Sequence, residues 1–181
     1  DGFSATYHNA WPDSASAFTT GKYGSAFSLN GVDQYISLSD SVDDLSGGDW
    51  TIEMWINYDV MTRYSGPIAT DRDKVLPTGN TAGEFDFHIR TASAPHYISF
   101  FVRNDPNGNF IITNSNVAIT ADTWHHVAAS FVSSTNTIYI AVDGTVASDT
   151  QSEYADISLG AESALQIGKN RTNAQFFNGQ I

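Results

Sequence analysis

The chain has 181 residues, and its 8 Lys and Arg residues against 20 Asp and Glu residues give a formal net charge of -12. Such an acidic chain repels phosphate backbones and anionic lipid headgroups, so neither nucleic acid nor membrane insertion is expected. The absence of cysteine excludes disulfides, thiolate metal sites and thiol nucleophiles, and no apolar run approaches the length of a membrane span.

Short alternating apolar runs, separated by Gly, Asn, Asp, Ser and Thr, follow one another along the whole chain and predict an all-β fold. We expect one domain over residues 1–181, because the sequence shows no internal repeat, linker or shift in composition. The expected strands, in chain order, are Ala5 to His8, Ala26 to Leu29, Tyr35 to Leu38, Trp50 to Tyr58, Pro67 to Thr70, Glu84 to Arg90, Tyr97 to Arg103, Asn109 to Thr113, Trp124 to Phe131, Thr137 to Asp143, Val146 to Asp149, Ala164 to Gly168 and Gln175 to Ile181.

Turn and loop signals separate these strands. Asp143 and Gly144 lie between two β runs and predict a type I′ hairpin, whose two central residues both need positive φ. The polar, Gly-rich stretches 39–49 and 70–83 are expected loops at the rim of the fold, the first with one helical turn around Val42 to Leu45.

The strand from Glu84 to Arg90 divides its side chains between two faces. Alternation places Phe85, Phe87 and Ile89 on the core side and turns Glu84, Asp86, His88 and Arg90 outward. If TASAPH is the connecting loop, an antiparallel register sets Arg90 opposite Tyr97, His88 opposite Ser99, Asp86 opposite Phe101 and Glu84 opposite Arg103. That register predicts a cross-strand ion pair and a cation–aromatic contact, each at most about 1 kcal/mol at an exposed site.

Six segments in order, spanning nearly the whole chain, resemble the laminin-G-like, concanavalin A-like jelly-roll family. They are GKYGSAFSLNGVDQYISL (21–38), DWTIEMWIN (49–57), TWHHVAASF (123–131), IYIAVDGTVAS (138–148), LQIGKN (165–170) and FFNGQI (176–181). The resemblance implies a two-sheet antiparallel β-sandwich used mostly to bind glycans or proteins at a cell or particle surface, often with one calcium ion at the rim. Some relatives are glycosidases or polysaccharide lyases, and the fold alone does not choose among these functions.

One departure from the family concerns the end of the sequence. The strand that normally follows the Phe-Asn-Gly segment is absent after Ile181. A jelly roll without that strand leaves a sheet edge uncovered, so we expect either a longer natural protein or a neighbouring domain or chain over that edge.

A second departure concerns the two catalytic carboxyl groups found in hydrolase relatives. Hydrolase relatives carry Glu-x-Asp-x-Glu or Glu-x-Asp-x-x-Glu on one strand, because a retaining mechanism needs two carboxyl groups about 5 Å apart. Glu84 and Asp86 match the first half, but the second glutamate is replaced by His88 or Ile89. We therefore expect no enzymatic activity.

Two locations for a glycan site remain open. The first is the outward face of the strands just described, where carboxylates, cations and rings offer the groups that bind sugar hydroxyls and ring faces. Its candidates are Glu84, Asp86, His88, Arg90, Tyr97 and Arg103, with Trp55 as an added stacking platform. The second location is the rim loops, with Arg63, Tyr64, Asp71, Arg72, Asp73, Asn170 and Arg171.

For calcium, the family resemblance makes Asp33 the best candidate ligand, with Asn30 beside it and further carboxylates at Asp40, Asp43, Asp44 and Asp49. No Asp-x-Asp-x-Asp-Gly loop is present, so a solvated acidic loop that caps a short turn is slightly favoured over a set of calcium ligands. His125 and His126 are adjacent on an expected strand and point to opposite faces, which argues against a shared metal ion.

These observations favour a non-catalytic carbohydrate-binding or adhesion module of a secreted, cell-surface or virion protein, such as a bacterial extracellular protein or a phage fibre. The alternative is a structural module that mediates protein contacts on a particle surface. A glycoside hydrolase or polysaccharide lyase is the third and least supported class.

Overall fold

The computed structural model describes residues 5–9, 11, 17–38, 48–70, 84–103, 110–150, 165–171 and 175–181. Several sequence predictions lie outside these residues: the helical turn at Val42 to Leu45 and the candidates Asp40, Asp43, Asp44, Asp71, Arg72 and Asp73. The backbone of Glu84 is described but its side chain is not.

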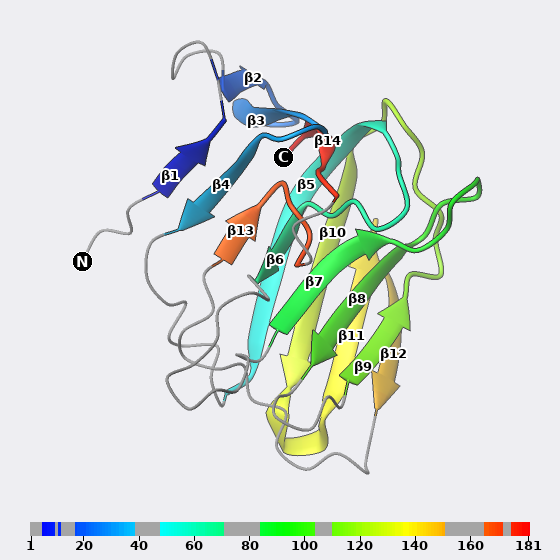
Figure 1. Cartoon of the computed structure of the whole chain (residues 1–181). Coiled ribbons are helices and arrows are strands. Elements are labelled where there is room, and N and C mark those ends of the chain that lie inside the picture. The colour runs from blue at the N-terminus through cyan, green and yellow to red at the C-terminus, as the bar shows by residue number, and fades with distance from the viewer. Residues whose placement is uncertain are drawn as a thin grey trace.

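The described residues form two antiparallel sheets of seven strands each, packed face to face (Figure 1). The first sheet has the order β1 (Ala5–His8), β4 (Tyr35–Leu38), β13 (Leu165–Ile167), β6 (Ile68–Thr70), β7 (Glu84–Ile89), β8 (Ile98–Arg103) and β9 (Phe110–Asn114). The second has the order β12 (Thr145–Thr150), β11 (Thr137–Val142), β10 (His125–Val132), β5 (Trp50–Val60), β14 (Asn178–Gln180), β3 (Ser25–Asn30) and β2 (Phe18–Thr20). The predicted all-β sandwich is confirmed.

The core lies between the sheets and is rich in aromatic rings. Trp50 on β5 lies 5.2 Å from Phe85, 5.7 Å from Phe100 and 6.1 Å from Phe131, measured between ring centroids. Phe85 and Phe100 belong to the first sheet and Phe131 to the second, so these contacts join the two layers. Burying each such side chain contributes about 1.5–3 kcal/mol.

The strands follow the sequence prediction closely, because alternating apolar residues mark the half-buried ones. The bounds of β1 and β4 match at both ends, whereas β14 covers only Asn178–Gln180 of the expected Gln175 to Ile181. The short strand β2 and a 3-10 turn at Ser133–Thr135 were not predicted.

Two predicted local geometries are also confirmed. Asp143 and Gly144 have φ values of 49° and 81° and join β11 to β12, as a type I′ hairpin requires. In the β7–β8 pair, Glu84 lies opposite Arg103, Asp86 opposite Phe101 and His88 opposite Ser99. This register extends past the strand end, where the Arg90 N–H donates to the Tyr97 carbonyl at 2.9 Å.

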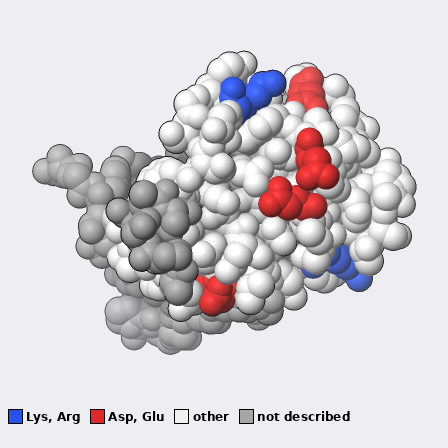
Figure 2. Space-filling model, turned by 90° about the horizontal axis from the view of Figure 1, so that it is seen from above, with Lys and Arg blue, Asp and Glu red and all other residues white. Residues whose placement is uncertain are grey.

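Charged side chains of both signs lie apart from one another on the face drawn in Figure 2. Figure 2 shows one face of the molecule, on which the Lys and Arg side chains of the described residues lie in small groups with acidic side chains between them. Within the described part of the chain, no helix is long and apolar enough to cross a membrane.

Candidate functional site

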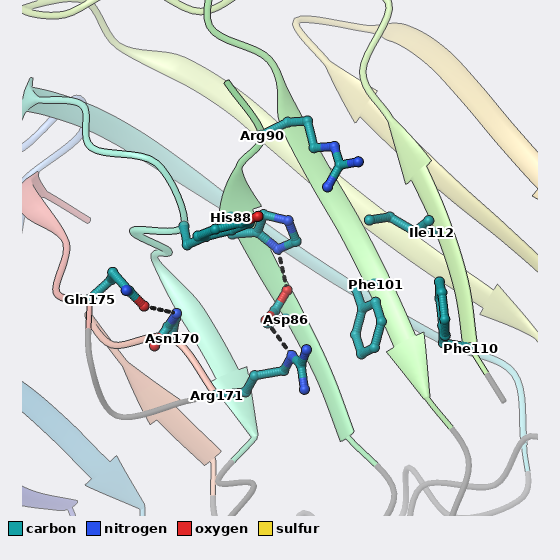
Figure 3. Close-up of a pocket in the computed structure, with 10 residues that line it drawn as sticks. Asp86, His88, Arg90, Phe101, Phe110, Ile112, Asn170, Arg171 and Gln175 are labelled. Atoms are coloured by element: carbon teal, nitrogen blue, oxygen red, sulfur yellow. Dashed lines mark hydrogen bonds and ion pairs between the residues drawn. The ribbon is translucent and has the colours of Figure 1, made fainter. Parts of the chain in front are cut away.

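A cavity of about 410 Å³ lies on the face of the first sheet that points away from the core (Figure 3). This volume falls within the range of roughly 300–1,000 Å³ typical of small-ligand pockets. Strands β7, β8 and β9 and two loops contribute its lining residues, which are Tyr64, Asp86, His88, Arg90, Phe101, Phe110, Ile112, Asn170, Arg171 and Gln175. The cavity therefore combines residues from both predicted locations, the sheet face and the rim loops.

The loop between β5 and β6 forms the first wall. The Tyr64 N–H donates to the Ile89 carbonyl and the Ile89 N–H donates to the Ser65 carbonyl, at 2.9 and 3.0 Å, which joins the loop to the end of β7. Gly66 permits this approach, because a Cβ atom there would lie 2.0 Å from the carbonyl oxygen of Phe87.

Tyr64 itself has a φ of 69°, which is uncommon for a residue with a side chain. The surrounding bonds hold it there: the Ser65 hydroxyl donates to the Thr62 carbonyl at 2.7 Å, and the buried Tyr58 hydroxyl donates to the Ser65 carbonyl at 3.1 Å. The Tyr64 ring lies 5.6 Å from the His88 ring, so this constrained loop covers one side of the histidine.

The second wall comes from the segment after β13. Asn170 pairs with Gln175 through its backbone N–H, at 3.0 Å, and through its side-chain amide, which donates to the Gln175 side-chain oxygen at 2.6 Å. Asn170 is buried at 3% exposure. This pairing fixes the position of Arg171, which reaches over the sheet to Asp86.

Asp86 is the polar centre of the cavity floor. Its Oδ1 lies 2.5 Å from Nδ1 of His88, and its Oδ2 lies 3.1 Å from Nε of Arg171 (Figure 3). Both carboxylate oxygens are thus engaged. A carboxylate with only 3% of its residue exposed requires such partners, because an unpaired buried charge is strongly unfavourable.

Part of this outward row is buried. Asp86 and His88 point away from the core, as predicted, but they are only 3% and 6% exposed, whereas Arg90 at the end of the row is exposed. The physical reason is that the two walls come from segments distant in sequence, and strand alternation gives no information about them.

His88 has one nitrogen without a partner. Because Nδ1 faces a carboxylate that can only accept, Nδ1 carries a proton and donates. The other nitrogen, Nε2, is buried and has no hydrogen-bond partner among the described residues. A buried polar atom of this kind costs about 1–3 kcal/mol unless a partner arrives, and here it borders a cavity.

The opposite side of the cavity is apolar and aromatic. Phe101 on β8 stacks on Phe110 on β9 with ring centroids 5.4 Å apart and an interplanar angle of 28°. The Arg171 guanidinium lies 4.4 Å from the centroid of Phe101. Phe110 is 49% exposed, which leaves a ring face available at the mouth of the cavity.

Other predicted site residues lie outside this cavity. Tyr97 and Arg103 flank it on the same sheet, and the Arg63 guanidinium lies 4.5 Å from the ring centroid of Tyr64. Trp55 belongs to the second sheet, where it contacts Tyr23, His126 and Lys22, so it cannot extend the β7 face.

Four lining residues are not among the predicted site residues: Phe101, Phe110, Ile112 and Gln175. Ile112 carries a usable signal, because it lies opposite Phe101 in the β8–β9 pair and so shares the outward face. Gln175 carries no local signal, since its place depends on the pairing with Asn170.

Two of the candidate calcium ligands, Asn30 and Asp33, contact each other and the backbone of their own turn. The side-chain oxygen of Asn30 accepts hydrogen bonds from the backbone N–H groups of Val32, Asp33 and Gln34, and its amide donates to Oδ1 of Asp33. Calcium takes six to eight oxygen ligands, and the described residues contain no group of three or more acidic or His side chains placed to hold an ion. These two residues alone do not form a site, and calcium binding stays a prediction.

A second Asp–His pair lies on the other sheet. His125 is buried; its Nδ1 lies 2.7 Å from Oδ2 of Asp143 and its Nε2 accepts from the Thr120 N–H at 3.1 Å. Burial raises the pKa of Asp143, but the hydrogen bonds from His125 and from the His126 N–H outweigh it and hold the pKa below its usual value. His126 points the other way, toward Glu53 at 3.5 Å, as predicted for adjacent strand residues.

The sandwich and its lateral cavity place the protein in the jelly-roll class that includes lectins and related domains. The chain belongs to the concanavalin A-like lectin/glucanases superfamily, whose family model matches residues 30–181. No curated protein matches the sequence significantly.

Solved structures share the fold at low identity. Domain 4 of an extracellular arabinanase from Geobacillus stearothermophilus, in complex with arabinotriose, is 18% identical with a TM-score of 0.66, and the match covers 90% of this chain and 70% of that one. A sialidase module from Ruminococcus gnavus bound to α2,3-sialyllactose is 13% identical with a TM-score of 0.63, covering 86% and 85%. Tailspike protein 2 of an Escherichia coli O157:H7 bacteriophage is 13% identical with a TM-score of 0.56, covering 86% of this chain but 21% of that one.

Proposed function

We propose that this chain is a non-catalytic carbohydrate-binding module and that the cavity over β7, β8 and β9 is its binding site. The observation that carries the proposal is Nε2 of His88, which borders a cavity of about 410 Å³ and has no hydrogen-bond partner among the described residues. With a ring proton on Nδ1 directed to Asp86, Nε2 is available for a hydrogen bond to a hydroxyl group, which sugars offer on every ring.

The rest of the lining supports the same ligand class. Phe110 offers an exposed ring face for the C–H side of a sugar, and Asn170 and Gln175 add amide groups at the wall. Arabinotriose and sialyllactose are the sugars named for two structures with this fold, which is consistent with the proposal.

A hydrolytic role has less support. A glycosidase needs two carboxyl groups on either side of the scissile bond, one of them able to act as nucleophile or base. Asp86 has both oxygens engaged by His88 and Arg171, and the position two residues further on is a histidine. We assign carbohydrate binding without cleavage, within a secreted, cell-surface or virion protein.

The test is a glycan array combined with affinity electrophoresis on soluble polysaccharides, with wild type and His88→Asn. The Asn amide keeps a donor for Asp86 but removes Nε2, so affinity should fall about tenfold or more while the fold persists. His126→Asn makes the same change on the other sheet and should leave binding unchanged.

Two results would overturn the proposal. If wild type binds no saccharide with or without calcium, the structural, protein-contact reading replaces it. If His88→Asn binds as tightly as wild type, the site lies elsewhere.

A further inference from the structure

The ionisable side chains that line the cavity do not balance in charge. Among the described lining residues, two guanidinium groups, Arg90 and Arg171, accompany a single carboxylate, Asp86, with the imidazole of His88. This local excess of positive charge occurs in a chain whose formal net charge is -12. A cavity whose net charge is opposite in sign to that of the whole chain indicates the charge of its ligand.

The two arginines differ in what they already contact. Arg171 pairs with Asp86 through Nε at 3.1 Å and lies over Phe101, so its charge is matched within the protein. The guanidinium of Arg90, by contrast, has no hydrogen bond or ion pair to any described residue, and both oxygens of Asp86 already have other partners. Within the described part of the cavity, the unmatched positive charge therefore resides on Arg90.

The backbone sets the position of this arginine. Arg90 directly follows β7, and its N–H donates to the Tyr97 carbonyl at 2.9 Å. This bond continues the antiparallel register of β7 and β8 one residue past Ile89, the last residue of β7. Figure 3 shows its guanidinium on the same side of the sheet as His88, directed toward Ile112. It thus borders the same space as the unpartnered Nε2 of His88.

A guanidinium presents a planar fork of donors that matches the two oxygens of a carboxylate, and such charge-assisted pairs are about twice as strong as neutral hydrogen bonds. Neutral sugars contain no group that uses this fork fully. Building on the carbohydrate-binding function proposed above, we infer that the cavity selects acidic saccharides, with Arg90 binding a sugar carboxylate while Nε2 of His88 accepts from a hydroxyl of the same ligand.

The experiment compares matched ligands by isothermal titration calorimetry. The probes are trigalacturonate, an oligomannuronate and sialyllactose, each alongside its carboxyl-reduced counterpart, which keeps the rings and linkages but replaces the carboxylate by a hydroxymethyl group. We expect at least one acidic probe to bind about tenfold or more tightly than its reduced partner, and this preference to weaken as salt rises.

Variants of Arg90 assign the preference to this residue. Arg90→Gln should remove the preference while leaving binding of the reduced sugar, and Arg90→Lys should retain part of it, because lysine keeps the charge but not the fork. Lys22→Gln removes the same charge from an exposed position in the turn between β2 and β3, beside the other sheet, and should change nothing.

The outcomes separate the two proposals. If reduced and acidic probes bind equally, or if the preference survives in Arg90→Gln, the acidic-ligand inference is wrong while carbohydrate binding stands. If no acidic or neutral probe binds, carbohydrate binding itself fails.

Discussion

The protein contains two Asp–His pairs, one on each sheet, and they differ in the second nitrogen of the imidazole. His125 donates to Asp143 through Nδ1 and accepts from the Thr120 N–H through Nε2, so all its hydrogen-bonding capacity is used. His88 has the same carboxylate contact with Asp86, but its Nε2 has no partner among the described residues.

The carboxylates differ as well. Asp86 is almost fully buried and also pairs with Arg171, whereas 43% of the Asp143 side chain is exposed. The comparison shows that an Asp–His pair does not by itself mark a site. A pair with both nitrogens engaged stabilises a hairpin, and a pair with one nitrogen facing a cavity can bind a ligand.

The largest expected difference between the two pairs is the loss of stability when each aspartate is replaced by asparagine. Asp86→Asn removes the charge between Arg171 and His88 in a buried setting and should lower the free energy of unfolding by about 3 kcal/mol. Asp143→Asn, at an exposed turn that suits asparagine, should cost less than about 1 kcal/mol. Urea denaturation of both variants checks this; equal losses would show that the pairs are energetically alike.

The next effect concerns the loop wall that covers one side of His88. Gly66→Ala places a Cβ against the Phe87 carbonyl, so the loop must move, with an expected loss of about 2 kcal/mol and weaker ligand binding. Gly48→Ala, where a Cβ would meet nothing within 4 Å, is the matched control. Thermal unfolding and titration of both variants measure it, and a fully stable Gly66→Ala would contradict the close approach.

A smaller effect separates the two histidines by function. His125→Asn loses a hydrogen bond to the Thr120 N–H and should destabilise the protein by about 1 kcal/mol without changing ligand affinity. His88→Asn should show the opposite balance, with affinity more affected than stability. Denaturation and titration on the same samples give both numbers, and a loss of affinity in His125→Asn would remove the distinction.

The smallest effect is the pH dependence of the Asp143 pair. Hydrogen bonds from His125 and His126 hold the pKa of Asp143 in the folded protein below its unfolded value near 3.9. The ionised carboxylate therefore stabilises the folded protein at higher pH, and this stabilisation is lost as pH falls below about 4 and through the folded-state pKa. The stability difference between wild type and Asp143→Asn should therefore shrink between about pH 4 and 2. A difference that stays constant over that range would show that the carboxylate is not the group involved.

Much of the fold could be predicted because it follows from alternation and turn chemistry. Phe85, Phe87 and Ile89 are fully buried, and the register that sets Asp86 opposite Phe101 follows from the length of one connecting loop. The type I′ turn at Asp143 and Gly144 depends only on two adjacent residues. Information of this kind is local, and a single sequence contains it.

The site could be predicted only in part, because its closure depends on residues far apart in the chain. Asp86, His88 and Arg90 were placed on one outward face, but their covering by Tyr64 and Arg171 arises from tertiary pairing. The strand containing Trp55 gave a correct alternation but no assignment to a sheet. For this reason the sequence alone leaves the sheet face and the rim as alternatives, although residues of both line one cavity.

Strand β7 lies between β6 and β8 in the first sheet. Its residues 85, 87 and 89 belong to the core, and its residues 86 and 88 line the cavity. Neighbouring codons therefore encode two independent properties, since the side chains of one set do not touch the space of the other. Substitutions among the cavity positions change the lining of the cavity while the packing between the sheets is preserved. The chemistry of the cavity can therefore change by single replacements in one strand.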